Sequence, residues 1–234
     1  MSLGTPRLPL GTPRLHYREI GSTNDRAREL AVAGAPHGML VTAREQSGGR
    51  GRQGRTWVAT PGRALLCSLV IRDPPRLLPL AAGVAVAELA GERALVKWPN
   101  DVLLDRRKVA GILVEGRPQE GWAVVGIGVN VALREQDFPL ELRDRAGTLG
   151  LSPDQIESTL GRLTALLDRW LVASAEEVLA AARARDALRG QRVRWADGQG
   201  RADGIDGEGR LVVLTDGGRV MLDAGEVHLE GDTA

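Results

Sequence analysis

The sequence predicts an α+β fold in which a mixed, mainly antiparallel sheet is flanked by helices and followed by a small C-terminal β-barrel. Between residues 94 and 131, short β-type runs are separated by short turns, which join antiparallel strands, whereas parallel strands need long crossovers. From Asp186 onward the sequence changes to short alternating runs punctuated by Asp-Gly and Gly-Gly, a pattern typical of a small barrel. We therefore predict two domains, residues 16–185 and 186–234.

The N-terminal part of the chain combines a repeat with one helix signal. The sequence LGTPRL occurs at residues 3–8 and again at 10–15, without the charged-then-apolar order of a signal peptide. We expect residues 1–15 to form a flexible leader outside the fold. Next, Ser22-Thr23-Asn24-Asp25 has the form of a capping box and predicts a helix over about residues 24–33.

The remaining elements follow from periodicity and from turn residues. A glycine-rich segment, residues 47–56, is predicted to be a mobile loop between two strands. A buried helix rich in Leu, Ala and Val follows it. In order along the chain, the expected strands are 39–45, 64–71, 94–98, 102–104, 109–115 and 122–131, and the expected helices after the first are 74–91, about 153–172 and about 174–188.

Composition excludes several classes of protein. With 43% hydrophobic residues, 26% charged residues and a formal net charge of +1, the chain is neither disordered nor a polyelectrolyte attracted to DNA or anionic membranes. The longest apolar stretch, residues 77–89, is too short to span a membrane. The single cysteine, Cys67, forms no internal disulfide and no zinc-binding pair, which predicts a reducing, cytoplasmic setting.

The rare residue types of this arginine-rich chain mark its unusual segments. Only two of the 31 basic residues are lysines, Lys97 and Lys108, and the only asparagines are Asn24, Asn100 and Asn130. Lys97 stands before the turn Pro99-Asn100-Asp101, where a cation and a carboxylate could hold a triphosphate and its Mg²⁺. The alternative is a tight turn with a stabilising aromatic residue.

Lys108 precedes an otherwise apolar strand, which suggests that it binds a carboxylate and a phosphate together; the alternative is a lysine that reaches to solvent. In the strand that follows, alternation places Gly126, Gly128 and Asn130 on one face. Glycine weakens a strand unless something approaches the backbone closely, so we expect a flat ligand on that face with Asn130 at its edge. A β-bulge or a bend is the alternative.

The glycine-rich loop contains a formal GxGxxG match at Gly49, Gly51 and Gly54. No helix pattern follows it, so it does not fit a dinucleotide-binding fingerprint. Its arginines and glycines suit a loop that folds over an anionic ligand, with peptide N–H groups and guanidinium groups on phosphate oxygens. An RGG-like nucleic-acid segment or a solvated loop is the alternative.

Taken together, these segments resemble the biotin–protein ligases. The resemblance covers about residues 16 to 131 by motif: Ser22-Thr23-Asn24, Glu45 to Arg55, Lys97 to Asp101, Lys108 to Glu115 and Gly126 to Asn130. Residues 186–230 resemble the SH3-like C-terminal domain of that family by pattern only. The resemblance implies a catalytic domain related to class II aminoacyl-tRNA synthetases. It also implies that biotin and MgATP form biotinyl-5′-adenylate, from which biotin passes to a lysine of a biotin carboxyl carrier domain.

The resemblance also assigns roles to residues. It implies that Lys108 and Arg52 are catalytic, and that Asp101 binds the metal. The implied biotin-binding residues are Ser22, Thr23, Asn24, Gln46, Gly49, Arg50, Gly51, Arg52, Lys108 and Gly111. The implied ATP-binding residues are Arg52, Arg55, Trp57, Lys97, Asn100 and Asn130. No histidine lies in these motifs, so the base that deprotonates the target lysine stays unassigned.

The loop departs from the family pattern at Gln53, where an arginine is usual, so it carries one charge less. Only about 20 residues precede Ser22, too few for the winged helix of some family members, so we expect no DNA binding. We expect no membrane partner, and a monomer or a homodimer.

Two alternatives remain. A lipoate ligase shares the fold and chemistry, but the loop and the GIGVN strand argue against it. An RNA-binding module is disfavoured because residues 186–234 hold 10 acidic and 6 basic side chains, a net charge of −4.

Overall fold

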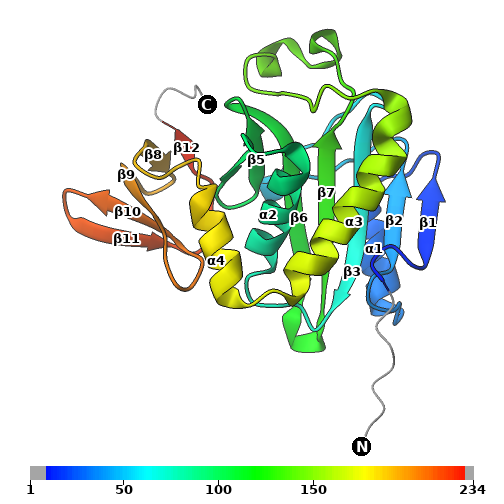
Figure 1. The fold of residues 1–234 in the computed structure, drawn as a ribbon, viewed down its shortest axis with the longest axis horizontal. Coiled ribbons are helices and arrows are strands. Elements are labelled where there is room, and N and C mark those ends of the chain that lie inside the picture. Colours follow the sequence, from blue (N-terminus) through cyan, green and yellow to red (C-terminus); the bar gives the residue numbers. More distant parts are fainter. Residues whose placement is uncertain (1–8, 230–234) are drawn as a thin grey trace, which may run out of the picture.

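The computed structural model describes residues 9–229 and contains two sheets (Figure 1). The larger sheet has seven strands in the order β1-β2-β3-β7-β6-β5-β4. Its only parallel pair is β1 with β2, and the other neighbours are antiparallel. The strands are β1 (Arg14–Tyr17), β2 (Leu40–Ala43), β3 (Ala64–Arg72), β4 (Leu95–Lys97), β5 (Asp101–Leu104), β6 (Arg107–Arg117) and β7 (Trp122–Asn130). The predicted α+β fold with a mixed, mainly antiparallel sheet is confirmed.

Helices cover both faces of this sheet. Helix α1 (Thr23–Val32) packs on one face, and α2 (Leu78–Ala90) and α3 (Ile156–Val172) lie on the other, as Figure 1 shows. Helix α4 (Ala175–Ala184) contacts α2. Short 3-10 turns occur at Arg52–Gly54, Pro118–Glu120, Glu135–Asp137, Leu140–Leu142 and Pro153–Gln155. None of the helices in residues 9–229 has the length and apolar character that a membrane span requires.

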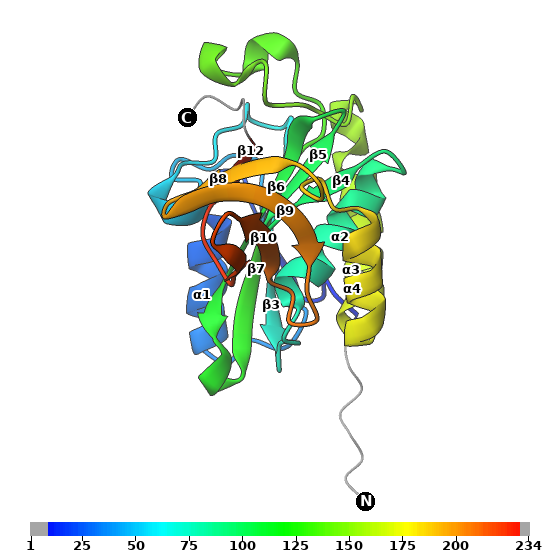
Figure 2. The same cartoon turned by 90° about the vertical axis from the view of Figure 1, so that its left-hand side faces the viewer.

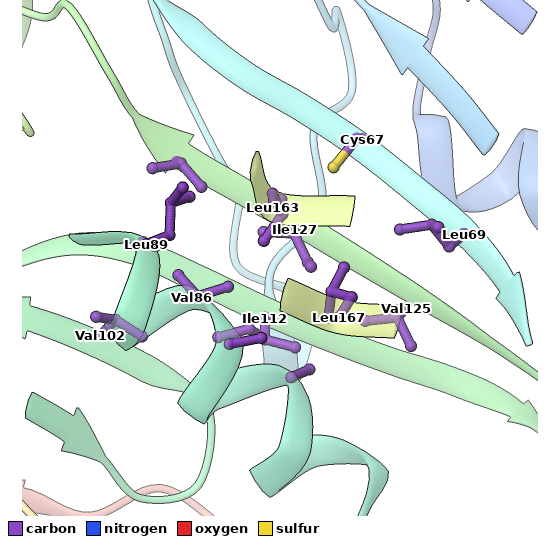
Figure 3. Packing of buried hydrophobic residues seen from close by; sticks show 14 of the residues in the cluster. Cys67, Leu69, Val86, Leu89, Val102, Ile112, Val125, Ile127, Leu163 and Leu167 are labelled. Carbon is purple, nitrogen blue, oxygen red and sulfur yellow. The ribbon is translucent and has the colours of Figure 1, made fainter. Parts of the chain in front are cut away.

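Strand alternation divides the core into two layers. On β7, Val125, Ile127 and Val129 join the cluster that packs under α2 and α3, together with Leu163 and Leu167 (Figure 3). Val124 belongs to a different cluster, formed with α1. Because side chains alternate along a strand, Gly126 and Gly128 lie on the same face as Val124, which is the α1 face. The glycines of β7 are therefore kept away from the main core.

The second sheet follows α4 in the chain. It lies next to the edge of the first sheet that β5 and β4 form, on the side of the molecule that faces the viewer in Figure 2. Its strands are β8 (Arg192–Trp195), β9 (Gly198–Ile205), β10 (Leu211–Thr215), β11 (Gly218–Leu222) and β12 (His228–Leu229). They pair antiparallel in the order β11-β10-β9-β8-β12, so the C-terminal part of the chain is a small all-β unit, as expected.

This sheet shares a hydrophobic cluster with the first part of the chain. Leu77, Leu80 and Trp98 pack with Leu211 and Val213. In addition, the indole N–H of Trp98 donates to the carbonyl of Gly209 over 3.1 Å. The two sheets are thus joined through a common core beside the turn that follows β4.

The expectation of a leader over residues 1–15 is wrong for residues 9–15, while residues 1–8 lie outside the described part. Leu10 is buried in the main core, and β1 begins at Arg14. Strand β1 pairs with β2 in register from Arg14 opposite Leu40 to Tyr17 opposite Ala43. The Pro- and Gly-rich sequence concealed a strand because β1 has only four residues and lies at the sheet edge.

Two helix boundaries also differ from the expected ones. The helix expected at 174–188 ends at Ala184, because Val96 then exchanges backbone hydrogen bonds with the chain that leaves the helix, at Arg185 and Ala187. The helix expected at 74–91 begins at Leu78. The expected strand positions agree with the structure to within a few residues.

Candidate active site

A cavity of about 150 Å³ opens between the loop of residues 50–57, the start of α1, the turn after β4, strands β6 and β7, and residues 225–227 of the C-terminal sheet. Most of the residues that the resemblance singled out line it. They are Ser22, Thr23, Asn24, Gln46, Arg50, Gly51, Arg52, Arg55, Trp57, Lys97, Asn100, Asp101, Lys108 and Gly111. Gly49 and Asn130 are not part of the lining. Segments as far apart in the sequence as Ser22 and Val227 therefore converge on one pocket.

The start of α1 is held by a buried polar network. Gln46 Oε1 accepts hydrogen bonds from the backbone N–H of Thr23 at 2.7 Å and from its hydroxyl at 3.0 Å. The Ser68 hydroxyl lies 2.8 Å from Thr23 Oγ1 and 2.7 Å from Asn24 Oδ1. Ser22 is the N-cap, but its side chain makes no cap bond, so the predicted capping box does not form. Ser22 instead lines the pocket.

The glycines of β7 make room for side chains of the protein itself. A Cβ atom on Gly126 would lie 2.0 Å from Asn24 Oδ1, and one on Gly128 would lie 2.6 Å from the Trp57 ring. A Cβ on Gly111 of β6 would lie 3.0 Å from the same ring. The expectation that a flat ligand alone explains these glycines is thus corrected, because Asn24 and the indole of Trp57 already occupy the space above them.

Asn130 has a different position from the one expected. Its side chain is buried, and Nδ2 donates to the carbonyl oxygen of Gly147 at 2.9 Å. Its carbonyl accepts from the backbone N–H of Leu149 at 2.8 Å. Asn130 therefore ties β7 to the segment after it. Gly49, near the start of the glycine-rich segment, packs closely against the backbone of Trp57, because a Cβ atom there would meet the carbonyl oxygen of Trp57 at 2.3 Å.

A chain of polar contacts joins the loop, the turn and β6. Lys108 Nζ lies 2.7 Å from Asp101 Oδ1, and Asn100 Nδ2 donates to the same oxygen at 3.1 Å. Arg52 Nη1 in turn donates to Asn100 Oδ1 at 3.0 Å. Lys108 Nζ also lies 5.7 Å from the centroid of the Trp57 ring, within the range of a cation–π contact. The loop position is thereby coupled to both cationic and acidic groups of the pocket.

The other two loop arginines have carboxylate partners. Arg50 Nη1 lies 2.6 Å from Asp25 Oδ1, and Arg50 Nη2 lies 3.1 Å from Glu115 Oε1. Arg55 forms an ion pair with Glu226 of the C-terminal sheet. The glycine-rich sequence of residues 47–56 predicts a mobile loop with several like charges. In the structure each guanidinium has a partner of its own, and an antiparallel bridge joins Arg50 and Thr56.

The charges of the lining suit a polyanionic ligand. Five cationic side chains line the pocket against two carboxylates, a formal excess of three positive charges; they are Arg50, Arg52, Arg55, Lys97 and Lys108 against Asp101 and Glu226. The indole N–H of Trp57 is buried without a hydrogen-bond partner in the described structure, where the ring packs over Gly128. Within residues 9–229 no three acidic, histidine or cysteine side chains cluster as a metal site.

Comparison with known proteins supports the residue pattern. Residues 17–131 match the biotin/lipoate A/B protein ligase family, and residues 190–229 match the biotin protein ligase C-terminal domain. The biotin–[acetyl-CoA-carboxylase] ligase of Mycobacterium tuberculosis is 35% identical over 193 residues, which is 75% of this chain and 71% of that protein. The chain belongs to the biotin/lipoate A/B protein ligase family.

Other members of the biotin/lipoate A/B protein ligase family match over a smaller share of their length. The bifunctional ligase/repressor BirA of Bacillus subtilis is 39% identical over 152 residues, 60% of this chain and 47% of that protein. The chain thus spans about half the length of this relative. Among solved structures, a biotin protein ligase from Aquifex aeolicus in complex with biotin and ATP superposes with a TM-score of 0.77 at 28% identity, covering 93% of this chain and 98% of that one.

Several residues that line this family member's pocket, or that contact its lining, were not found from its motifs. Ser68 is a buried hydroxyl in an apolar strand, a signal that the sequence does offer. Asp25 and Glu115 lie within or beside the motifs, but their pairing with Arg50 depends on how α1 packs against the sheet. Glu226 carries no sequence signal, because its role depends on where the second sheet lies.

Proposed function

We propose that this chain is a biotin–protein ligase that activates biotin with MgATP and transfers it to a lysine of a biotin carboxyl carrier domain. The observation that carries the proposal is the convergence of Lys97, Lys108 and the loop arginines on one cavity. Relatives named as biotin–[acetyl-CoA-carboxylase] ligases, and a structural neighbour in complex with biotin and ATP, support it. The match of residues 190–229 to a biotin protein ligase C-terminal domain favours biotin over lipoate.

In the first step, a carboxylate oxygen of biotin attacks the α-phosphorus of ATP, and pyrophosphate leaves. This step brings two anions together, so cationic groups must offset the growing negative charge. We assign Lys108 to the carboxylate and the α-phosphate, and Arg52 to the same centre. Arg55 and Lys97 then bind the outgoing phosphates. Because Lys108 pairs with Asp101, its ammonium group is held in place before the substrates arrive.

A magnesium ion fits the turn after β4. Mg²⁺ in nucleotide sites is held by one or two carboxylates together with substrate phosphates, so the single carboxylate of Asp101 is sufficient. The amide of Asn100, hydrogen-bonded to Asp101 Oδ1 at 3.1 Å, fixes the orientation of that carboxylate. When bound, the ion would neutralise phosphate charge.

The product of the first step is a mixed anhydride that water would hydrolyse. The loop of residues 50–57 excludes water when it lies over the pocket, and its contacts with Asn100, Asp25 and Glu115 are the means of holding it there.

Several features outside the pocket belong to the same proposal. Residues 16–185 would be the catalytic domain, residues 186–234 would be the C-terminal domain, and the protein would act in the cytoplasm, where its buried free thiol, Cys67, stays reduced. A monomer or homodimer and the lack of DNA binding also remain predictions.

The test is the release of pyrophosphate by the purified protein on addition of biotin and MgATP, with lipoate and octanoate as alternative acids. We expect release with biotin only. Lys108→Gln should reduce the rate by about 100-fold or more, the usual effect of removing one group that stabilises transition-state charge. Release with lipoate but not with biotin would refute the proposal. So would equal rates for wild type and Lys108→Gln.

A further inference from the structure

Glu226 is an unexpected group in a pocket that binds anions. It lies between β11 and β12 of the C-terminal sheet, and it lines the cavity together with Gly225 and Val227. Its carboxylate forms an ion pair with Arg55 and lies 3.7 Å from His228 Nε2. A carboxylate at this position repels the phosphates that Arg55 would bind, so its presence needs a reason.

The two carboxylates of the described lining differ in their surroundings. Asp101 contacts Lys108 and Asn100 inside the pocket, and it is the residue suited to a metal ion. Glu226 contacts neither of these residues. Its main partner is Arg55, whose side chain is 61% exposed and belongs to the loop. When phosphates bind Arg55, Glu226 loses that partner and can accept another cation.

The reaction supplies such a cation in its second step. The target lysine of the carrier arrives as an ammonium ion, and it must lose a proton before its nitrogen can attack a carbonyl carbon. The other carboxylate of the described lining, Asp101, is held by Lys108 and Asn100. The nearby Asp25 and Glu115 are paired with Arg50. The exchange of Arg55 for an ammonium group would make Glu226 available at the right stage.

Glu226 also lies where a protein substrate would enter. A second groove runs between the loop and the C-terminal sheet and shares Gln53, Gly225 and Glu226 with the cavity. Its other walls include the half-buried Trp195 and the small residues Ala196 and Gly198. A lysine that enters along this groove therefore meets the Glu226 carboxylate before it reaches the cavity.

We propose that Glu226 binds the ammonium group of the target lysine where the groove meets the cavity and takes its proton. This inference rests on the proposed function. The neutral amine nitrogen then forms a bond to the carbonyl carbon of the biotinyl adenylate. The bond from that carbon to the phosphate oxygen breaks, and its electron pair leaves with AMP. The second proton of the nitrogen goes to solvent, which completes the amide.

The charged groups around Glu226 come from three segments. Arg55 faces it from the loop, His228 faces it from β12, and Arg194 and Asp197 line the adjoining groove from β8 and the turn after it. Glu226 is the one carboxylate of this set that lines both the cavity and the groove, so its replacement should change the pH dependence of transfer most.

The experiment compares Glu226→Gln with Glu226→Asp in two half-reactions. Pyrophosphate release measures activation, and transfer from synthetic biotinyl-5′-AMP is measured to a carrier domain and to hydroxylamine, which is uncharged at neutral pH. In Glu226→Gln we expect transfer to the carrier to fall by about 100-fold, with recovery at alkaline pH, while transfer to hydroxylamine stays within twofold. The KM for ATP should fall by about twofold to fivefold, because Arg55 no longer has a competing partner.

A matched control is Glu208→Gln. It removes a second ion pair between the C-terminal part and the first part of the chain, in which Glu208 lies 2.6 Å from Arg76, outside the pocket. It should leave both half-reactions unchanged, and Glu226→Asp should keep transfer to the carrier within about tenfold of wild type. Two results for Glu226→Gln would overturn this inference but leave the proposed function intact. One is an equal loss of transfer to the carrier and to hydroxylamine, and the other is transfer to the carrier within twofold of wild type. If wild type releases no pyrophosphate with biotin, the proposed function fails, and this inference fails with it.

Discussion

The space above Gly128 holds the indole of Trp57, and Gly128→Ala tests whether that space positions the loop. The added Cβ would lie 2.6 Å from the ring, whereas ordinary contact begins at 3.4 Å, so the ring must move by about 3.4 − 2.6 = 0.8 Å. Trp57 is part of the loop that carries Arg52 and Arg55. A displacement of the indole therefore moves the arginines that would contact the substrates.

The effect on activity should be much larger than the effect on stability. A misplacement of about 1 Å can reduce a catalysed rate by about 100-fold, and we expect a loss of this size in pyrophosphate release. The backbone at Gly128 is an ordinary strand, where alanine is favoured over glycine by roughly 0.5–1 kcal/mol, which offsets part of the lost contact. The free energy of unfolding should therefore change by about 1 kcal/mol or less.

The assay combines urea denaturation, pyrophosphate release and the rate of tryptic cleavage within the loop. Gly161→Ala is the control, because nothing lies within 4 Å of a Cβ at that position of α3. It should keep full activity and gain about 1 kcal/mol of stability. If Gly128→Ala keeps full activity, or if it loses several kcal/mol of stability, the reasoning that this glycine serves the loop is refuted.

Three further predictions concern the core and the joint between the sheets. Leu163→Ala, in the fully buried side of α3, should lose about 2–5 kcal/mol of unfolding free energy, and a loss below 1 kcal/mol would contradict the assigned packing. Trp98→Phe removes the hydrogen bond to the Gly209 carbonyl, so the free energy of unfolding should fall by about 1–3 kcal/mol in urea denaturation. The KM for ATP should rise because Lys97 is adjacent to Trp98. An unchanged KM would contradict a link between the contact of the two sheets and the pocket. Burial raises the pKa of the Asp186 carboxyl above its ordinary value of 3.8. The stability that protonated Asp186 contributes is therefore fully present below about pH 3.8, and it is lost as the pH rises through the raised pKa. Asp186→Asn should thus gain stability relative to wild type between about pH 4 and pH 7, and a difference that is constant across pH would contradict this.

Local sequence was sufficient for most elements of the first sheet. The alternation of Val125, Ile127 and Val129 predicts a strand with one face in the core, and these residues do pack under α2 and α3. Sequence failed at the edge, where β1 has four residues and its partner, β2, is more than 20 residues away. A strand of that length is formed by its neighbour rather than by its own propensity.

The site shows the same division between local and distant effects. The motifs placed Lys97, Lys108 and the loop arginines in one pocket, and the structure brings them together there. Asn130 was placed at a ligand edge because its strand position is correct, but its side chain bonds to Gly147 on a segment that the motif does not include. The direction in which a polar side chain finds its partner depends on the fold around it.

The sequence by itself determined which faces of the strands are apolar, where glycines leave space, and where the scarce lysines stand, because these properties depend on residues a few positions apart. Only the tertiary structure decided what fills the space above Gly128 and which acid meets Arg55. That acid, Glu226, is 171 residues away along the chain. Contacts over such a separation depend on how two sheets pack through Trp98 and Leu211, and no local pattern encodes that arrangement.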